Sequence, residues 1–196
     1  MSDVNQHIGD INSKTIFKNN ILCAQFIRDN INIPLLKDVQ PEDLEDVTER
    51  FSSYFGIEYE ADTVKRIRIH IEDYEEEFYM ISLIDHKSDV DYNVAMQLLK
   101  YMACIWAEYE KTFLVERGKI SKNKSFKYPP IIPVVYYEGK KEWTADMHLR
   151  DRIMFSDILR PYIPDFRYIV VRNHDFSDEE LLAREDEMSL LMLINK

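Results

Sequence analysis

The 196-residue sequence has few glycines and cysteines and no long apolar run. Four glycines and the lack of any repeated segment argue against linkers, solenoids and low-complexity tails. No apolar stretch approaches the roughly 20 residues of a membrane-spanning helix. The first residues also lack the basic and apolar regions of a signal peptide, so we expect a soluble protein of the cytoplasm.

The two cysteines, Cys23 and Cys104, are isolated within apolar surroundings. No C-x-x-C spacing suggests zinc, and two buried thiols fit a reducing compartment better than a disulfide framework. The sequence also contains no glycine-rich phosphate loop and no Ser–His–Asp arrangement. It therefore offers no support for nucleotide hydrolysis or covalent catalysis.

Hydrophobic residues make up 45% of the sequence and aromatic residues 12%, which is sufficient for one sizeable core. Residues 1–196 are therefore expected to form a single domain. The last apolar segment continues to Ile194 without a capping residue, and we expect the natural chain to extend further.

The net charge of −11 is unevenly distributed. Residues 38–62 contain nine acidic side chains against Arg50 alone, whereas residues 117–141 contain seven basic side chains against Glu138 alone. Phosphate contacts depend on lysine and arginine, so an acidic protein needs a local basic surface to bind nucleic acid. The basic segment is either such a surface or a solvated loop. Its candidate DNA-binding residues are Lys119, Lys122, Lys124 and Lys127.

Apolar periodicity and turn residues predict alternating helices and strands, and hence an α/β sandwich around a mixed sheet. Ser177 and Glu180 form a capping box at the start of a C-terminal helix. Pro133 within a strand indicates an edge position or an irregularity. The expected helices are 13–31, 41–55, 91–116 and 176–194, and the expected strands are 64–71, 78–84, 131–137 and 167–171, with a turn at 72–77. The solvent-facing side of the first strand is expected to carry Lys65, Arg66, Arg68 and His70.

The apolar strand at residues 78–84 leads directly into Asp85 and Lys87. Side chains alternate along a strand, so both should share a face with Ile81. In an antiparallel hairpin the start of the preceding strand, after Asp62, lies beside this end. Mg²⁺ or Mn²⁺ would relieve the repulsion between two carboxylates that meet there. The alternative is a simple Asp–Lys ion pair at the rim of the sheet.

The pattern "EYEAD", 22 residues, "DHK" resembles the split metal-binding signature of the PD-(D/E)XK nuclease superfamily. Three longer segments are similar in order and spacing to the Rpn family of recombination-promoting nucleases, also known as "putative transposases", over roughly residues 13–160. These segments are ADTVKRIRI, FYMISLIDHKSDVDYNVAMQLLKYMACIW and YPPIIPVVYYEGKKEWT. The resemblance implies a three-layer, restriction-endonuclease-like sandwich, with a central mixed β-sheet flanked by helices.

Position by position, the resemblance makes Asp62 and Asp85 ligands of Mg²⁺ and Lys87 the catalytic lysine. Rpn-like proteins more often carry Glu in place of Asp85, and often Gln in place of Lys87. Gln97 and Tyr101, four residues apart on one helix face, resemble the Q-x-x-x-Y element that RecB-like members place beside the metal. The alternative is that Tyr101 belongs to the core and Gln97 is a half-buried helix residue.

The resemblance implies a Mg²⁺-dependent DNA endonuclease linked to recombination or mobile elements. Two alternatives stay open. One is a nuclease fold that has lost activity and serves as a DNA-binding or protein-interaction module, and the other is a toxin-type nuclease that acts on RNA. A homodimer is compatible with the cutting of both DNA strands, which requires two sites.

Overall fold

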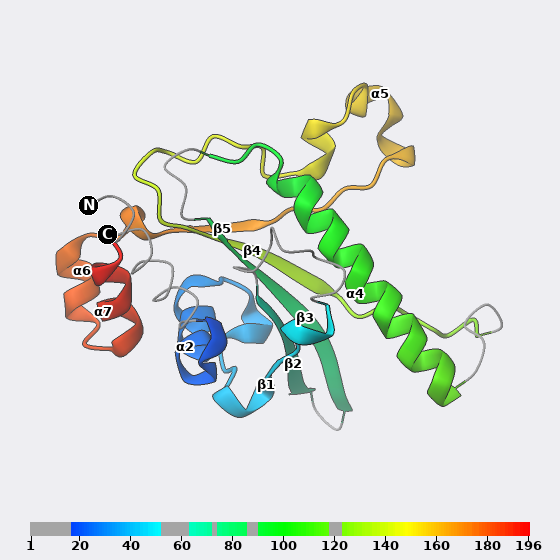
Figure 1. Ribbon diagram of the computed structural model, residues 1–196, viewed down its shortest axis with the longest axis horizontal. Helices are drawn as coiled ribbons and strands as arrows, with labels where there is room; N and C mark the ends of the chain where they lie inside the picture. Colours follow the sequence, from blue (N-terminus) through cyan, green and yellow to red (C-terminus); the bar gives the residue numbers. More distant parts are fainter. Residues whose placement is uncertain (1–16, 52–62, 72–73, 86–89, 118–122) are drawn as a thin grey trace.

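The computed structural model describes residues 17–51, 63–71, 74–85, 90–117 and 123–196. These residues form a five-stranded sheet with helices on both faces (Figure 1). The helices are α2 (Asn20–Asn30), α4 (Val94–Arg117), α5 (Ser156–Leu159), α6 (Asp178–Ala183) and α7 (Glu187–Ile194). The strands are β1 (Leu44–Asp46), β2 (Thr63–Ile71), β3 (Tyr74–Asp85), β4 (Ile131–Tyr137) and β5 (Ile169–Arg172). Short 3₁₀-helices are η1 (Pro34–Leu36), η2 (Pro41–Asp43), η3 (Thr48–Arg50), η6 (Leu149–Arg152), η7 (Arg160–Tyr162) and η8 (Asn173–Asp175).

The sheet is mixed, as the order of elements predicted. Its strands lie in the order β1-β2-β3-β4-β5. The first three are antiparallel neighbours, whereas β4 runs parallel to both β3 and β5. Parallel neighbours need a long crossover, which α4 supplies between β3 and β4. The β2–β3 hairpin is thus followed directly by the longest helix.

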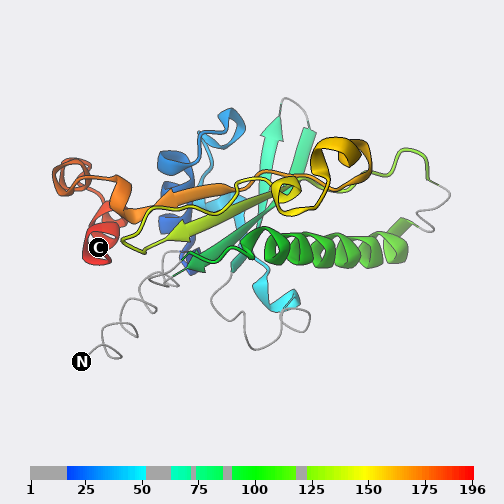
Figure 2. The same cartoon turned by 90° about the horizontal axis from the view of Figure 1, so that it is seen from above.

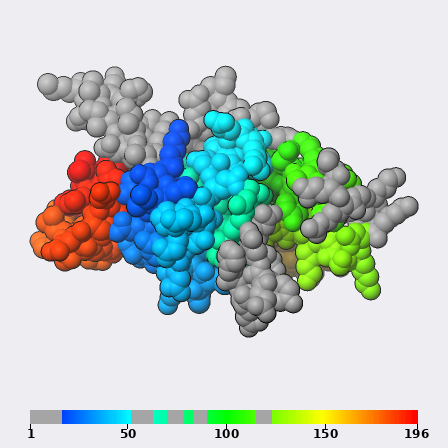
Figure 3. Space-filling model, turned by 90° about the horizontal axis from the view of Figure 1, so that it is seen from below, coloured from blue at the N-terminus to red at the C-terminus, as the bar shows by residue number. Residues whose placement is uncertain are grey.

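Two apolar clusters separate the helices from the sheet. On one face, Phe26 of α2 and Met80 of β3 belong to a cluster that also includes residues of α6 and α7. On the opposite face, Leu98 of α4 joins a cluster with Ile81 of β3. Figure 2 shows α4 along one side of the sheet, and Figure 3 shows α2 beside the α6–α7 pair. The predicted three-layer sandwich is confirmed.

The long helix predicted at residues 91–116 is confirmed as α4, which has 24 residues. Before it begins, the Asp91 carboxylate accepts a hydrogen bond from the Asn93 N–H at 2.8 Å, a local bond that favours the turn into the helix. Despite its length α4 is amphipathic, and none of the helices in the described ranges has the length and apolar character needed to cross a bilayer.

Residues 41–55, predicted as a helix, instead contain the edge strand β1 between the single turns η2 and η3. Glu45 of β1 lies opposite Arg66 of β2. The Glu45 carboxylate binds the guanidinium groups of both Arg66 and Arg68. The helix prediction was wrong because contacts with a strand some twenty residues away override the local pattern.

The predicted helix at residues 176–194 is divided into α6 and α7. Ser177 caps α6 as expected, because its Oγ accepts a hydrogen bond from the Glu180 N–H at 3.0 Å. The chain then turns at Glu185, whose φ of 52° is not helical. The Asp186 carboxylate starts α7 by accepting from the N–H three residues further on, at 2.6 Å. The start of the predicted helix was correct, and its continuity was wrong.

The β2–β3 hairpin is longer than predicted. β3 begins at Tyr74, so the connection is residues 72–73 and the turn predicted at 72–77 was wrong. Within the described residues, neither β1 nor β4 reaches the outer part of the hairpin. In the register of this outer part, Arg68 lies opposite Glu77.

β4 has a neighbouring strand on each side, but Pro133 itself has no partner in the register with β5, as the predicted edge position requires locally. The reason lies in where β5 begins to pair. Val134 is the first β4 residue in register with β5, and Pro133 comes one residue earlier. At that position the missing N–H interrupts no ladder with β5.

Candidate functional site

The metal site predicted from the sequence falls at the ends of two adjacent strands. β2 begins at Thr63, directly after Asp62 in the sequence, and β3 ends at Asp85, two residues before Lys87. Asp62, Lys87 and the side chain of Asp85 lie outside the described residues. Their roles therefore stay predictions, and the structure describes the backbone that leads to them.

The register of the hairpin brings the start of β2 beside the last part of β3. Thr63 pairs with Ser82, and Val64 pairs with Ile81. At its end, β3 is also joined to the parallel strand β4, where Asp85 lies in register with Tyr137. The predicted neighbourhood of these two strand ends is confirmed for the backbone.

The two faces of the hairpin have different partners. Val64 and Ile81 belong to the apolar cluster under α4. Ile67 and Met80 belong to the cluster on the α2 side. Tyr79 and Ile81, two residues apart on β3, both face α4, and the predicted burial of Ile81 on this face is confirmed.

Gln97 and Tyr101 lie one turn apart on α4, above this face of the sheet. The Gln97 Nε2 group donates a hydrogen bond to the Tyr101 hydroxyl at 3.2 Å. Tyr101 is 2% exposed and belongs to the cluster that includes Ile81, whereas Gln97 is half-buried. Tyr101 is thus a core residue that orients Gln97. An accessory role of the pair in catalysis stays a prediction.

Aromatic rings hold the described part of the basic segment against the second half of α4. The Phe126 ring meets Phe113 edge-on with centroids 4.6 Å apart, and it meets Tyr128 at 5.0 Å. The Trp106 Nε1–H donates to the Pro129 carbonyl at 2.9 Å. These contacts fix residues 126–130 relative to the helix.

The anchored segment displays lysines to solvent. Lys124 and Lys127 flank Phe126, and both are exposed. Lys119 and Lys122, the other two predicted DNA-binding lysines, lie outside the described residues. The described lysines therefore extend from a segment that packs against α4 rather than from an unsupported loop.

The acidic segment at residues 38–62 is partly neutralised by arginines. Glu45 forms ion pairs with Arg50 at 3.0 Å, with Arg68 at 2.9 Å, and with Arg66. The hydrogen bond from Arg66 is the largest of the effects that lower the pKa of Glu45. The sequence count of acids against Arg50 alone missed this pairing, because two of the arginines come from β2.

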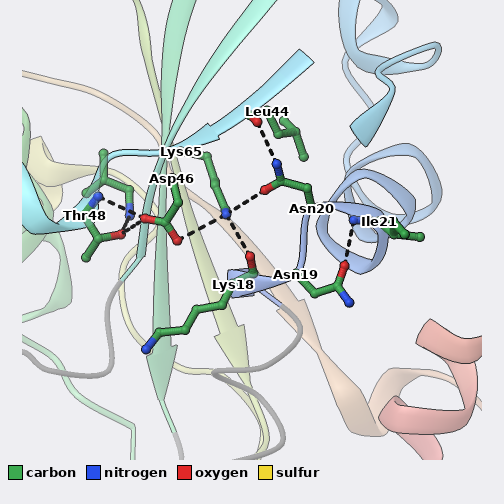
Figure 4. A network of polar contacts seen from close by, with 9 residues as sticks. Lys18, Asn19, Asn20, Ile21, Leu44, Asp46, Thr48 and Lys65 are labelled. Carbon is green, nitrogen blue, oxygen red and sulfur yellow. Dashed lines mark hydrogen bonds and ion pairs between the residues drawn. The ribbon is translucent and has the colours of Figure 1, made fainter. Parts of the chain in front are cut away.

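A buried lysine that the sequence analysis placed on the wrong face lies on the α2 side of β2. Lys65 is 0% exposed. Its Nζ donates to Asn20 Oδ1 at 2.9 Å, to the Lys18 carbonyl at 3.2 Å and to Asp46 Oδ2 at 3.2 Å (Figure 4). The expected solvent-facing position was wrong. The signal that could have found it is the strand alternation, because Lys65 lies two residues before Ile67 and therefore shares its buried face.

The Lys65 network also supports the first residues of β2. Asp46 accepts from the Thr48 hydroxyl at 2.6 Å and from the Thr48 N–H at 3.0 Å. The Thr48 Oγ1 in turn accepts from the Val64 N–H at 3.0 Å. Burial raises the pKa of Asp46, but the bonds from Thr48 and the charge of Lys65 outweigh burial, so the pKa lies below its usual value.

Both cysteines have free thiols. Cys23 is buried as expected, and burial raises its pKa to about 12, partly offset by the charge of Lys65. Cys104 is half-buried rather than buried, and burial also raises its pKa. Two unpaired thiols agree with the absence of a disulfide framework in the sequence.

Among the described residues, no group of three or more histidine, cysteine, aspartate or glutamate side chains is placed to hold a metal ion. This does not test the predicted site, whose carboxylates lie outside them. Carboxylates are the hard oxygen ligands that Mg²⁺ prefers, so Asp62 and Asp85 suit this ion by residue type and stay its predicted ligands.

The fold and the strand ends define a three-layer α/β protein whose hairpin leads into a candidate acidic site. A family model, Transposase_31, described as "Putative transposase, YhgA-like", matches residues 10–196. The chain therefore belongs to this family, as the sequence resemblance predicted. Membership associates the protein with mobile elements and with DNA. No curated protein and no solved structure matched the chain in the corresponding comparisons.

Proposed function

We propose that this protein is a metal-dependent DNA endonuclease, which hydrolyses phosphodiester bonds with Mg²⁺ or with Mn²⁺ in its place. One observation carries the proposal. The strand boundaries coincide with the acidic motif of the sequence, since β2 starts directly after Asp62 and β3 ends at Asp85. The transposase-like family supports DNA as the substrate.

Each residue of the motif has its own role in this proposal. Asp62 and Asp85 would hold the metal ion, which polarises the phosphodiester and lowers the pKa of a water molecule. Lys87 orients or deprotonates the attacking water and balances the negative charge that develops on the phosphate. Gln97, which donates to the Tyr101 hydroxyl, would contact a DNA phosphate beside the site.

DNA binding by an acidic protein needs a separate basic surface. Lys124 and Lys127 supply part of it from the aromatic anchor on α4. Their contacts with phosphates would release counterions, so affinity for DNA should fall steeply as salt rises. The surface tracks the backbone and carries no sequence preference of its own.

Nicking of supercoiled plasmid with Mg²⁺ or Mn²⁺ tests the proposal. The variants Asp62→Ala and Lys87→Ala should lose activity. Their matched controls are Asp38→Ala and Lys37→Ala, because both controls are exposed and lie far from the motif in sequence. Native-like thermal unfolding of all four variants would show that a loss of nicking is not a loss of fold.

The outcomes separate the alternatives. Nicking by the native chain and both controls, but by neither motif variant, is the expected result. Equal nicking by all proteins would contradict the site. No nicking by the native chain, together with no calorimetric binding of either metal, would favour an inactive nuclease fold. Two features of the sequence keep this alternative open: the net charge of −11, and an aspartate at position 85 where Rpn-like proteins more often carry glutamate. Faster cleavage of RNA than of DNA would favour the toxin-type alternative.

A further inference from the structure

The segment between β4 and β5 carries an exposed apolar surface. Residues 149–163, here named the arm, run through η6, α5 and η7 and project from the body of the molecule (Figure 1). The exposed fractions of its large apolar side chains are 81% for Met154, 69% for Phe155, 77% for Ile158, 43% for Leu159 and 85% for Tyr162. Monomeric proteins rarely leave a patch of several hundred Å² uncovered, and such a patch marks an interaction site.

The base of the arm is built into the fold. Leu149 is 0% exposed and belongs to the apolar cluster under α4. Its N–H donates to the Phe166 carbonyl at 3.2 Å, which joins the two ends of the arm. The Arg150 guanidinium binds the Asp165 carboxylate across the same base at 2.8 Å. The apolar tip is therefore presented from a fixed support and is not an unfolded loop.

The backbone at the tip is strained. Phe155 has a φ of 61°, in the left-handed region, which is unfavourable for a residue with a side chain. Its carbonyl accepts from the Leu159 N–H at 2.9 Å and so starts α5. Glycine would adopt this conformation more readily. A phenylalanine that is 69% exposed at such a position indicates a use for its ring.

The charges of the arm suit a second copy of the chain. Three arginines against two aspartates give the arm a net charge of +1, which leaves −12 for the rest of the chain. The acidic bodies of two copies repel each other over most of their surfaces. Two arms, each with a net charge of only +1, repel each other much less. Interspersed signs also fit a two-fold contact, in which Arg152 or Arg160 of one copy meets Asp157 of the other. The charged residues of the arm are Arg150, Asp151, Arg152, Asp157 and Arg160.

We propose that the arm is a dimerisation surface, on which a second copy of this chain docks arm against arm about a two-fold axis. On the scale of about 150–250 Å² for a whole aromatic side chain, complete burial of these five side chains would cover at most roughly 600 Å² per copy. A standard stable interface buries about 800 Å² per partner, which the polar rim of the arm can complete. A nucleic-acid wedge is less favoured, because the net charge of the arm is small and Arg150 is already held by Asp165.

Sedimentation analysis of the native chain and two variants at micromolar concentrations tests the proposal without any need for nuclease activity. The variant Ile158→Asp places like charges close together across a two-fold interface. The control Ile194→Asp changes an equally apolar residue on α7 that is 69% exposed. We expect a dimer for the native chain and the control, and a dissociation constant weakened about 100-fold for Ile158→Asp.

Each other outcome overturns the proposal. A native chain that stays monomeric has no dimerisation surface, and an Ile158→Asp variant that dimerises as tightly as the native chain places the interface elsewhere. A monomeric native chain whose DNA binding is weakened by Ile158→Asp would assign the arm to nucleic acid. Unfolding of Ile158→Asp is monitored by circular dichroism. If it occurs, Met154→Asp replaces it, since Met154 is 81% exposed and its side chain contributes little to the core.

Discussion

Replacing Asp46 by alanine tests how the buried ammonium of Lys65 is held. The substitution leaves a charge that is 0% exposed with two neutral acceptors, the Lys18 carbonyl and Asn20 Oδ1. Breaking a fully buried ion pair costs about 3–5 kcal/mol. The Asp46 side chain is 36% exposed, however, so water can reach part of the gap. We therefore expect the free energy of unfolding to fall by about 2 kcal/mol.

The same substitution in a Lys65→Met background isolates the ion pair. With no buried charge left to satisfy, Asp46→Ala should remove little more than the bonds to Thr48. The difference between the two costs is a coupling free energy of about 1–2 kcal/mol. Urea unfolding of the native chain, both single variants and the double variant measures it. Equal costs in the two backgrounds would refute the reasoning.

The pair also predicts a dependence on pH. The folded pKa of Asp46 lies below its usual value, because bonds from Thr48 and the charge of Lys65 outweigh burial. A carboxylate of this kind stabilises the fold above its unfolded pKa, and the contribution is lost as pH falls through the folded pKa. Below about pH 4, the native chain should therefore lose more stability than Asp46→Ala. Parallel acid-unfolding curves for the two proteins would contradict the assignment.

Three further predictions concern other parts of the molecule. At pH 8 a thiol reagent should label Cys104 in the folded protein but Cys23 only after unfolding. The reason is that Cys23 is buried and that burial raises its pKa to about 12. Equal labelling rates of the two cysteines in the folded protein would contradict this. Ser177→Ala should lower the free energy of unfolding by about 1 kcal/mol, since the Ser177 Oγ caps α6, whereas Ser177→Asp should not. The double variant Lys124→Ala/Lys127→Ala should reduce the slope of log affinity against log salt for duplex DNA by about 2; an unchanged slope would remove both lysines from the interface.

The features that the sequence predicted well are those decided by local periodicity. The helix at residues 91–116 has an uninterrupted apolar stripe without glycine or proline, and α4 follows it closely. By contrast, β1 depends on the pairing of Glu45 with Arg66, and no window of neighbouring residues contains both. The break between α6 and α7 was readable in principle, since Asp186 is a typical capping residue, but the strong apolar run after it masked the signal.

At the candidate site, too, the sequence predicted what depends on local spacing and missed what depends on contacts between distant residues. The sequence named Asp62 and Asp85 from their spacing, and the ends of β2 and β3 fall beside them. Lys65 was assigned to the solvent-facing side because lysine is a charged residue, although its place in the strand alternation puts it on the same face as the buried Ile67. Its burial depends on three acceptors brought from β1 and from the start of α2. Partners of that kind are defined only when the chain has folded.

Pro133 has a consequence that reaches beyond β4. The Tyr79 N–H donates to the Pro130 carbonyl, so the alternation along β4 directs the backbone of Pro133 away from β3 and toward β5. Because proline has no N–H, the ladder between β4 and β5 cannot grow backwards past this residue. On the side of the chain away from β4, the Tyr168 N–H donates to the Met147 carbonyl at 3.2 Å. Pairing with β5 thus begins directly after the residue that lacks an N–H, and the chain before β5 pairs with the segment around Met147 rather than with β4.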